Sequence, residues 1–199
     1  MEPSLYEWVD LGLPSGLKWA AWNVGATKPE EFGLYFDWGE TQGYKGITEE
    51  RKYKWADYTL CDGTSSNMLK YNATDGLTTL EASDDAAYAT DNTCRMPTSG
   101  ECAELTANTT SEWVEDYNGT GVAGRIFTSN VNGNSIFVPA AGYCLSGSVL
   151  GVGQCGILWS SSLNSSFVRN AYDLDFVSDD VAVGDFNRYY GHPVRAVKE

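Results

Sequence analysis

Short apolar runs joined by tight-turn residues fill the second half of the chain, and they constrain the fold more than any other feature. The runs at residues 126–128 and 135–138 flank Asn132-Gly133. This dipeptide is a strong short-range signal for a β-hairpin, because both of its residues accept the positive φ that a tight hairpin turn requires. Ser, Asn, Asp and Gly separate three further strand-like runs, at residues 156–160, 171–176 and 193–197. The C-terminal third is therefore predicted to be rich in β-strands.

The chain opens with a second predicted hairpin. Residues 8–13 and 17–22 are extended runs on either side of a Pro/Ser/Gly turn. Alternate apolar positions in these runs share one face, and they are Leu11, Leu13, Leu17 and Trp19. This hairpin therefore has an apolar side to bury.

Helices are predicted between the two strand-rich parts. Residues 29–36 begin with Pro and two acids, which suit the first turn of a short helix, and residues 83–88 look like another helix start. Thr98 with Glu101 has the spacing of a capping box. A helix is therefore expected from about Ser99 to Thr106, with Cys102 and Leu105 on its core-facing stripe.

A hairpin, then helices, then a run of strands is the order expected of an α+β fold with segregated elements. The chain has 199 residues, of which 42% are hydrophobic, and it has no repeat or long linker. That length supports one sizeable core, so we predict a single domain over residues 1–199.

The formal net charge is −14. Nucleic acid is held by clustered Lys and Arg, so no nucleic-acid partner is expected. A basic or neutral ligand such as a glycan is compatible with this charge, and so is an acidic surface that only keeps the protein soluble. No apolar run approaches the roughly 20 residues that cross a bilayer, so no membrane-spanning segment is expected. The first residues also lack the basic and apolar parts of a secretory signal.

Eight motifs occur in a fixed order from about Trp8 to Val197. They are VDLGLPSGLKWA at 9–20, NVGA at 23–26, FDWGE at 36–40, DDAA at 84–87, RMPT at 95–98, GNSIFVPAAG at 133–142, LWSSS at 158–162 and VRAV at 194–197. In this ordered set the chain resembles the Fibrobacter succinogenes major paralogous domain family, found in surface proteins of gut anaerobes.

The resemblance implies a C-type lectin-like fold, related to that of the formylglycine-generating enzymes, in which the N- and C-terminal strands pair. A second small sheet from the last third would then carry the ligand face. Similar proteins include bacterial adhesins, pilus-tip proteins and variable proteins diversified by retroelements. An extracellular or cell-surface location is therefore expected, with scaffold roles for Trp19, Trp38 and Trp159.

The chain departs from the family pattern at two cysteines. Cys94 stands where the family usually has Trp before Arg-Met-Pro-Thr, and Cys102 replaces an aromatic residue in the following helix. The pair could remain as thiols or form a bridge. Five cysteines leave at least one unpaired, and none lies in a C-x-x-C motif, so packed free thiols are the preferred interpretation.

No catalytic residue, metal site or cofactor is predicted. His192 is the only histidine, so zinc sites with two histidines are excluded. A Ser-His-Asp triad or a Cys-His dyad would have to use His192. We place His192 on the surface or rim. Asp173, Asp175, Asp179, Asp180 and Asp185 could hold a calcium ion, but carboxylates at alternate strand positions usually mark a solvated face. The lectin motifs E-P-N, Q-P-D and W-N-D are absent.

The composition of the C-terminal segment is unusual. Residues 160–197 contain no Lys, Glu, Gln, Met or Trp. Every residue type present is reachable from an AAC codon by changing its two adenines, as adenine-directed retroelement mutagenesis would do. The segment is therefore either diversified at some positions or an ordinary Ser/Asn-rich β segment. Gene codons outside the NNC pattern at Phe167, Val168, Arg169 and Asp173 would exclude diversification.

We predict a non-enzymatic recognition module that binds a protein or carbohydrate. Tyr, Phe and Arg give large, rigid or multiply bonding contact area. The predicted ligand-binding residues lie on the late strands and loops: Phe167, Val168, Arg169, Tyr172, Asp173, Asp175, Asp185, Phe186, Tyr189, Tyr190 and His192. Two alternatives stay open, a structural or pilus-tip subunit and a formylglycine-generating-type enzyme that would use Cys144 and Cys155.

Overall fold

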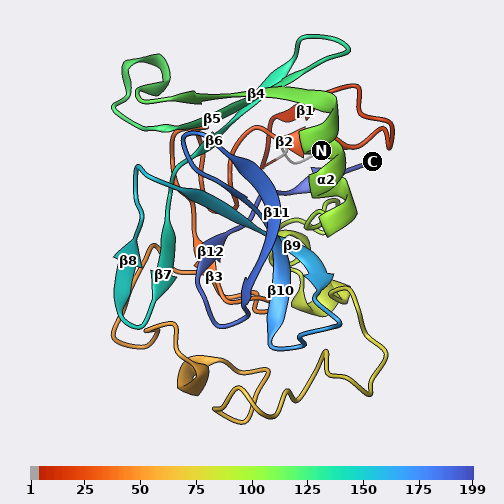
Figure 1. Ribbon diagram of the computed structural model, residues 1–199, viewed down its shortest axis with the longest axis vertical. Helices are drawn as coiled ribbons and strands as arrows, with labels where there is room; N and C mark the ends of the chain where they lie inside the picture. Colours follow the sequence, from red (N-terminus) through yellow and green to blue (C-terminus); the bar gives the residue numbers. More distant parts are fainter. Residues whose placement is uncertain (1–4) are drawn as a thin grey trace.

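The computed structural model describes residues 5–199 and shows an α+β fold built mostly from small antiparallel sheets (Figure 1). The helices are α1 (Ala86–Thr90) and α2 (Ser99–Asn108), with short 3-10 turns at Trp55–Asp57, Ala82–Asp84 and Tyr117–Gly119. The strands are β1 (Trp8–Asp10), β2 (Lys18–Ala20), β3 (Tyr35–Phe36), β4 (Thr109–Val114), β5 (Gly124–Ser129), β6 (Ser135–Pro139), β7 (Tyr143–Leu145), β8 (Ser148–Leu150), β9 (Gly156–Leu163), β10 (Asn170–Phe176), β11 (Val181–Asn187), β12 (His192–Pro193) and β13 (Val197–Lys198).

The predicted pairing of the first and last strands is confirmed. β2 lies between β1 and β13, and Trp19 pairs with Val9 on one side and with Val197 on the other. The alternating apolar set of this region is buried in one core cluster, which also contains Val197: Leu11, Leu13, Leu17 and Trp19. The period of two therefore identified the inner face of this hairpin correctly.

The hairpin predicted around Asn132-Gly133 is also confirmed. β5 and β6 pair in antiparallel register from Gly124↔Pro139 to Thr128↔Ser135, and β4 extends the sheet on the other edge of β5. Gly133 has a φ of 76°, the left-handed conformation for which glycine is suited.

Helix α2 begins where the capping box places it. The Thr98 hydroxyl accepts a hydrogen bond from the Glu101 N–H, and the Glu101 carboxylate accepts one from the Thr98 N–H. Cys102 and Leu105 are fully buried beneath α2, as predicted. The helix start expected near residues 83–88 is present as α1, with the Asp85 carboxylate accepting from the N–H groups of Ala87 and Tyr88.

The helix predicted over residues 29–36 is wrong. This segment is a turn followed by β3. Its backbone forms hydrogen bonds with another segment and not the internal bonds of a helix. The Leu34 N–H donates to the Val24 carbonyl, and the Asn23 side-chain amide donates to the Phe32 carbonyl. Gly33, at a φ of 78°, turns the chain toward these partners.

Two buried tryptophans join β3 to β9 reciprocally. The Trp38 indole N–H donates to the Ser160 carbonyl at 2.8 Å, and the Trp159 indole N–H donates to the Phe36 carbonyl at 2.8 Å. Both side chains are fully buried, as is Trp19. Buried indoles normally pair their N–H in this way, and these links agree with the scaffold role predicted for Trp38 and Trp159.

All five cysteines are free thiols. Cys94 and Cys102 belong to two different core clusters, so they are packed as separate thiols and do not form a bridge. Free cysteine packs as a small hydrophobe, which suits both positions.

Candidate functional site

The sheet formed by β9, β10 and β11 separates the predicted ligand residues into two groups. Directly opposed residues of an antiparallel pair lie on the same face. Ala171 pairs with Phe186 and Asp173 with Gly184, and both pairs lie on one face. Tyr172 pairs with Asp185 on the opposite face, which also bears Leu174 against the core beneath α2. The late strands therefore offer two surfaces and not one.

Four half-buried aromatic rings gather on the first of these faces. They are Tyr143 of β7, Phe186 of β11, and Tyr189 and Tyr190 of the following turn, and we call them the aromatic face. Tyr143 stacks on Tyr190 with ring centroids 5.9 Å apart, and Phe186 lies 5.7 Å from Tyr190. Tyr189 extends the group by contacting Tyr190 at 4.9 Å and Trp55 at 4.6 Å.

His192 lies beneath the aromatic face, which corrects the predicted surface or rim position. The ring is fully buried, stacks on Trp159 at 4.0 Å and meets Phe186 edge-on at 5.3 Å. Neither ring nitrogen has a hydrogen-bond partner among residues 5–199. Burial lowers the pKa of His192 well below its usual value, so the ring is neutral at physiological pH. The sequence did not reveal this position because the strands that cover it are distant in the chain.

Asp173 and Asp175 form a carboxyl pair on the same face of β10. A side-chain carbon on residue 184 would collide with Oδ2 of Asp175 and would lie 3.3 Å from Oδ1 of Asp173, so both carboxyl groups converge over Gly184. Asp173 is fully buried, contrary to the predicted solvated face, whereas Asp175 is partly exposed.

Each carboxyl group of the pair disfavours the charged form of the other. No N–H or O–H group of residues 5–199 reaches either oxygen of Asp173. Burial, followed by the charge of Asp175, raises the pKa of Asp173 well above its usual range. Burial also raises the pKa of Asp175, and Asp180 adds to the effect. Asp173 is the more deeply buried of the two, so it is the one that keeps its proton to higher pH.

Asp173→Asn is expected to stabilise the protein at neutral pH, by about 1–3 kcal/mol, because a neutral amide replaces a buried carboxyl group whose charged form is disfavoured. In the wild type the folded state keeps the Asp173 proton above about pH 4, where the unfolded chain loses it. Stability linked to this group therefore falls as pH rises between the unfolded and folded pKa. Urea unfolding from about pH 4 to pH 8 should show this fall in the wild type and its absence in the variant. The exposed Asp179→Asn is the control, and parallel curves for wild type and Asp173→Asn would refute the assignment.

Phe167, 60% exposed, Val168 and Arg169 belong to the turn between β9 and β10. Val168 packs against the same core clusters as Phe186, Tyr189 and Tyr190. Asp185, on the opposite sheet face beside Tyr172, accepts a hydrogen bond of 2.6 Å from the Asn170 amide. Of the eleven predicted residues, the structure thus brings together Val168, Phe186, Tyr189, Tyr190, His192, Asp173 and Asp175.

Arg188, which was not predicted, anchors the turn that carries Tyr189 and Tyr190. Its guanidinium is fully buried and donates to the carbonyls of Lys70, Tyr71 and Val168 and to the Tyr58 hydroxyl, at 2.8–3.1 Å. The charge also lies over the Trp38 ring at 4.8 Å. Tyr143 and Trp55 were missed as well, because nothing in the local pattern of either marks its distant partners.

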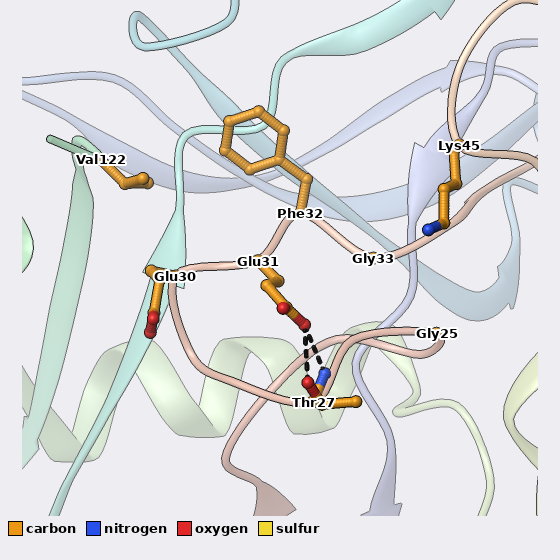
Figure 2. Close-up of a pocket in the computed structure, with 8 residues that line it drawn as sticks. All are labelled: Gly25, Thr27, Glu30, Glu31, Phe32, Gly33, Lys45 and Val122. Atoms are coloured by element: carbon orange, nitrogen blue, oxygen red, sulfur yellow. Dashed lines mark hydrogen bonds between the residues drawn. The ribbon is translucent and has the colours of Figure 1, made fainter. Parts of the chain in front are cut away.

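A separate hollow of about 520 Å³ lies on another part of the surface (Figure 2). In Figure 2, Lys45 stands on one side, Glu30 on the other, and Glu31 between them turns toward Thr27. The Thr27 N–H and hydroxyl bind the Glu31 carboxylate at 2.6 and 3.1 Å and lower its pKa. None of the eleven predicted ligand-binding residues lines this hollow.

Cys144 and Cys155, the two cysteines that the enzyme alternative would use, are a buried and a half-buried free thiol. Burial raises the pKa of Cys144 to about 12, with a further contribution from Asp37, and burial also raises the pKa of Cys155. Thiols with a raised pKa are poor nucleophiles at neutral pH. No group of three or more His, Cys, Asp or Glu in residues 5–199 is arranged to hold a metal ion.

Within residues 5–199 no helix is long and apolar enough to cross a membrane. Comparison of the chain with protein-family models, with curated proteins and with solved structures finds no match in any of the three.

Proposed function

We propose that this chain is a non-enzymatic, extracellular or cell-surface recognition module with a C-type lectin-like fold, and that it binds a protein or a glycan through the aromatic face. The observation that carries the proposal is the gathering of Tyr143, Phe186, Tyr189 and Tyr190, all half-buried, around a neutral buried histidine. The resemblance to a family of bacterial surface domains supports the proposed location and the finer fold.

The aromatic face has the physical properties of a contact surface. Tyrosine offers a large apolar ring and a hydroxyl with few rotatable bonds, so little conformational entropy is lost when a ligand binds. The rings already contact one another at 4.9–6.3 Å, which fixes their positions before binding. Aromatic rings also stack on sugar rings, so the same surface suits a glycan.

Buried side chains beneath the aromatic face hold its rings in place. Trp159 holds His192 from below and is itself tied to Phe36, while Arg188 fixes the turn at Tyr189 and Tyr190. A binding surface held within a fraction of an ångström by packed supporting residues binds more tightly than one on a loose loop.

Tyr190→Ala is expected to weaken binding by about tenfold or more while leaving the fold intact, because Tyr190 is the ring that contacts the other three. A glycan and protein array probed with both forms identifies the ligand and measures the loss. Tyr88→Ala is the matched control, since Tyr88 is an exposed tyrosine on α1 outside the aromatic face. Phe167→Ala reports whether the turn between β9 and β10 belongs to the same surface.

Retained binding in Tyr190→Ala would move the site away from the aromatic face. A wild-type domain that binds nothing on either array would favour the structural or pilus-subunit alternative. The proposal that the face is diversified is tested separately, by reading the codons of Phe186, Tyr189 and Tyr190 for the NNC pattern and by searching the neighbouring DNA for a template repeat.

A further inference from the structure

The carboxyl pair Asp173/Asp175 is an acidic site to which no basic side chain of residues 5–199 is paired. Asp173 is fully buried with both oxygens unpartnered by any N–H or O–H in that range, which is costly for a carboxyl group. His192, also fully buried and unpartnered, lies under the neighbouring rings. Unsatisfied buried polar groups beside a candidate contact surface point to a missing partner.

The pair is next to the aromatic face, and Asp175 is the member that solvent reaches. Phe186 is separated from Gly184 by one residue and points to the same side of β11 as the pair. On the other side, Tyr143 and Cys155 both lie against Gly151, and the charge of Asp175 contributes to the raised pKa of Cys155. Asp175 and Gly184 are partly exposed. Two rings and the Asp175 carboxyl group thus border one patch of surface, and Asp173 lies buried beside Asp175.

A metal ion fits this patch poorly. Calcium takes six to eight oxygen ligands, whereas the pair stands without a third acidic, His or Cys ligand among residues 5–199. An ammonium group needs fewer ligands, because it is bound by hydrogen bonds to carboxylates and by attraction to the faces of aromatic rings.

We propose that Asp175, with Asp173 buried beside it and Tyr143 and Phe186 at its flanks, binds an organic ammonium group such as a lysine side chain. This inference deepens the proposed function, because it assigns a positively charged group to the ligand of the aromatic face. When the ammonium binds, its N–H groups donate to the Asp175 carboxylate, and its positive charge favours the ionised form of the pair. Binding therefore strengthens as pH rises. The other charged groups near the pair are Asp180 and Asp185, which are both acidic and favour the same cation.

The test is an NMR titration of the ¹⁵N-labelled protein with Nα-acetyl-lysine N-methylamide, followed at the Gly184 amide. The neutral counterpart, acetylated at Nζ, is titrated in parallel. The charged probe is expected to give a saturable shift at Gly184 and the neutral probe none. Asp175→Asn should weaken binding by at least about tenfold. The matched control is Asp185→Asn, which removes the same charge from the opposite face of the sheet and should change affinity by less than about twofold.

Three outcomes would overturn the inference. Equal responses to the charged and neutral probes would show that the ammonium is not recognised. Equal losses in Asp175→Asn and Asp185→Asn would reduce the effect to general attraction by an acidic protein. A response to CaCl₂ that depends on Asp175, with none to the ammonium probe, would make the pair a metal site. Unfolding curves of both variants establish that each is folded.

The proposed function and this inference fail separately. An array ligand that is lost in Tyr190→Ala but retained in Asp175→Asn refutes the ammonium site and leaves the aromatic face as the binding surface. Ammonium binding at Gly184 combined with unchanged ligand binding in Tyr190→Ala supports the carboxyl pair and refutes the role of the aromatic face.

Discussion

Replacing Arg188 by methionine is expected to destabilise the protein by about 3–5 kcal/mol, and at the least to shift the urea midpoint far below that of the wild type. Methionine approximates the length of the arginine stem but donates no hydrogen bond. The guanidinium bonds to three backbone carbonyls and to one hydroxyl, all in buried or partly buried surroundings. Losing it leaves several acceptors unsatisfied at once, and each such group costs about 1–3 kcal/mol when water cannot reach it.

The control for this variant is Arg169→Met, which makes the same substitution at an exposed side chain in the turn between β9 and β10. Its effect should lie within about 0.5 kcal/mol. Equilibrium unfolding in urea, with the slope compared as well as the midpoint, measures both variants. Similar losses in the two would mean that the buried network around Arg188 does not hold the turn. Arg188→Met should also weaken ligand binding, since Tyr189 and Tyr190 follow it directly.

Trp159→Ala is expected to cost about 3–5 kcal/mol, the range found for truncating a buried tryptophan. The ring is fully buried in the core cluster that joins β3, β9 and the chain near Val194. Its removal leaves a cavity beneath His192 and breaks the 2.8 Å hydrogen bond to the Phe36 carbonyl. We expect His192 to sink into the space and the aromatic face above it to lose its fixed geometry.

Trp55→Ala is the comparison for Trp159→Ala, because Trp55 contacts the aromatic face at its edge, whereas Trp159 supports it from the core. Trp55 is a half-buried tryptophan that touches Tyr189 at the edge of the aromatic face. Its loss should cost clearly less stability than the loss of Trp159, and near-ultraviolet circular dichroism together with urea unfolding compares the two. If Trp159→Ala were no more destabilising than Trp55→Ala, the reciprocal link between β3 and β9 would not be a main support of the fold.

Local patterns predicted those parts of the fold whose partners are close in sequence. The Asn132-Gly133 hairpin and the Thr98/Glu101 capping box each depend on a few neighbouring residues, and both form as expected. The helix predicted over residues 29–36 was wrong for the complementary reason. Their first residues favour a helix, but backbone bonds to Asn23 and Val24, together with the positive φ of Gly33, outweigh that preference. Tertiary bonding overrides weak propensity of this kind.

The candidate site was predictable in composition but not in arrangement. A period of two places Asp173 and Asp175 on one face of a strand, yet it does not say whether another element covers that face. β12, which carries His192, pairs with β3 from the first quarter of the chain, so the burial of His192 depends on a contact across about 150 residues. Tyr143 reaches the aromatic face through a similar long-range arrangement, which no local pattern encodes.

The pairing of β13 with β2 has a consequence for biosynthesis. A ribosome extrudes the chain from its N-terminus, so β2 emerges early with one edge already satisfied by β1 and the other waiting for Val197 and Lys198. Until those residues leave the exit tunnel, the apolar side of the hairpin and an unpaired strand edge are open to other nascent chains. We expect this sheet to form only after Val197 and Lys198 have left the exit tunnel, and nascent chains truncated before Val197 to engage holdase chaperones.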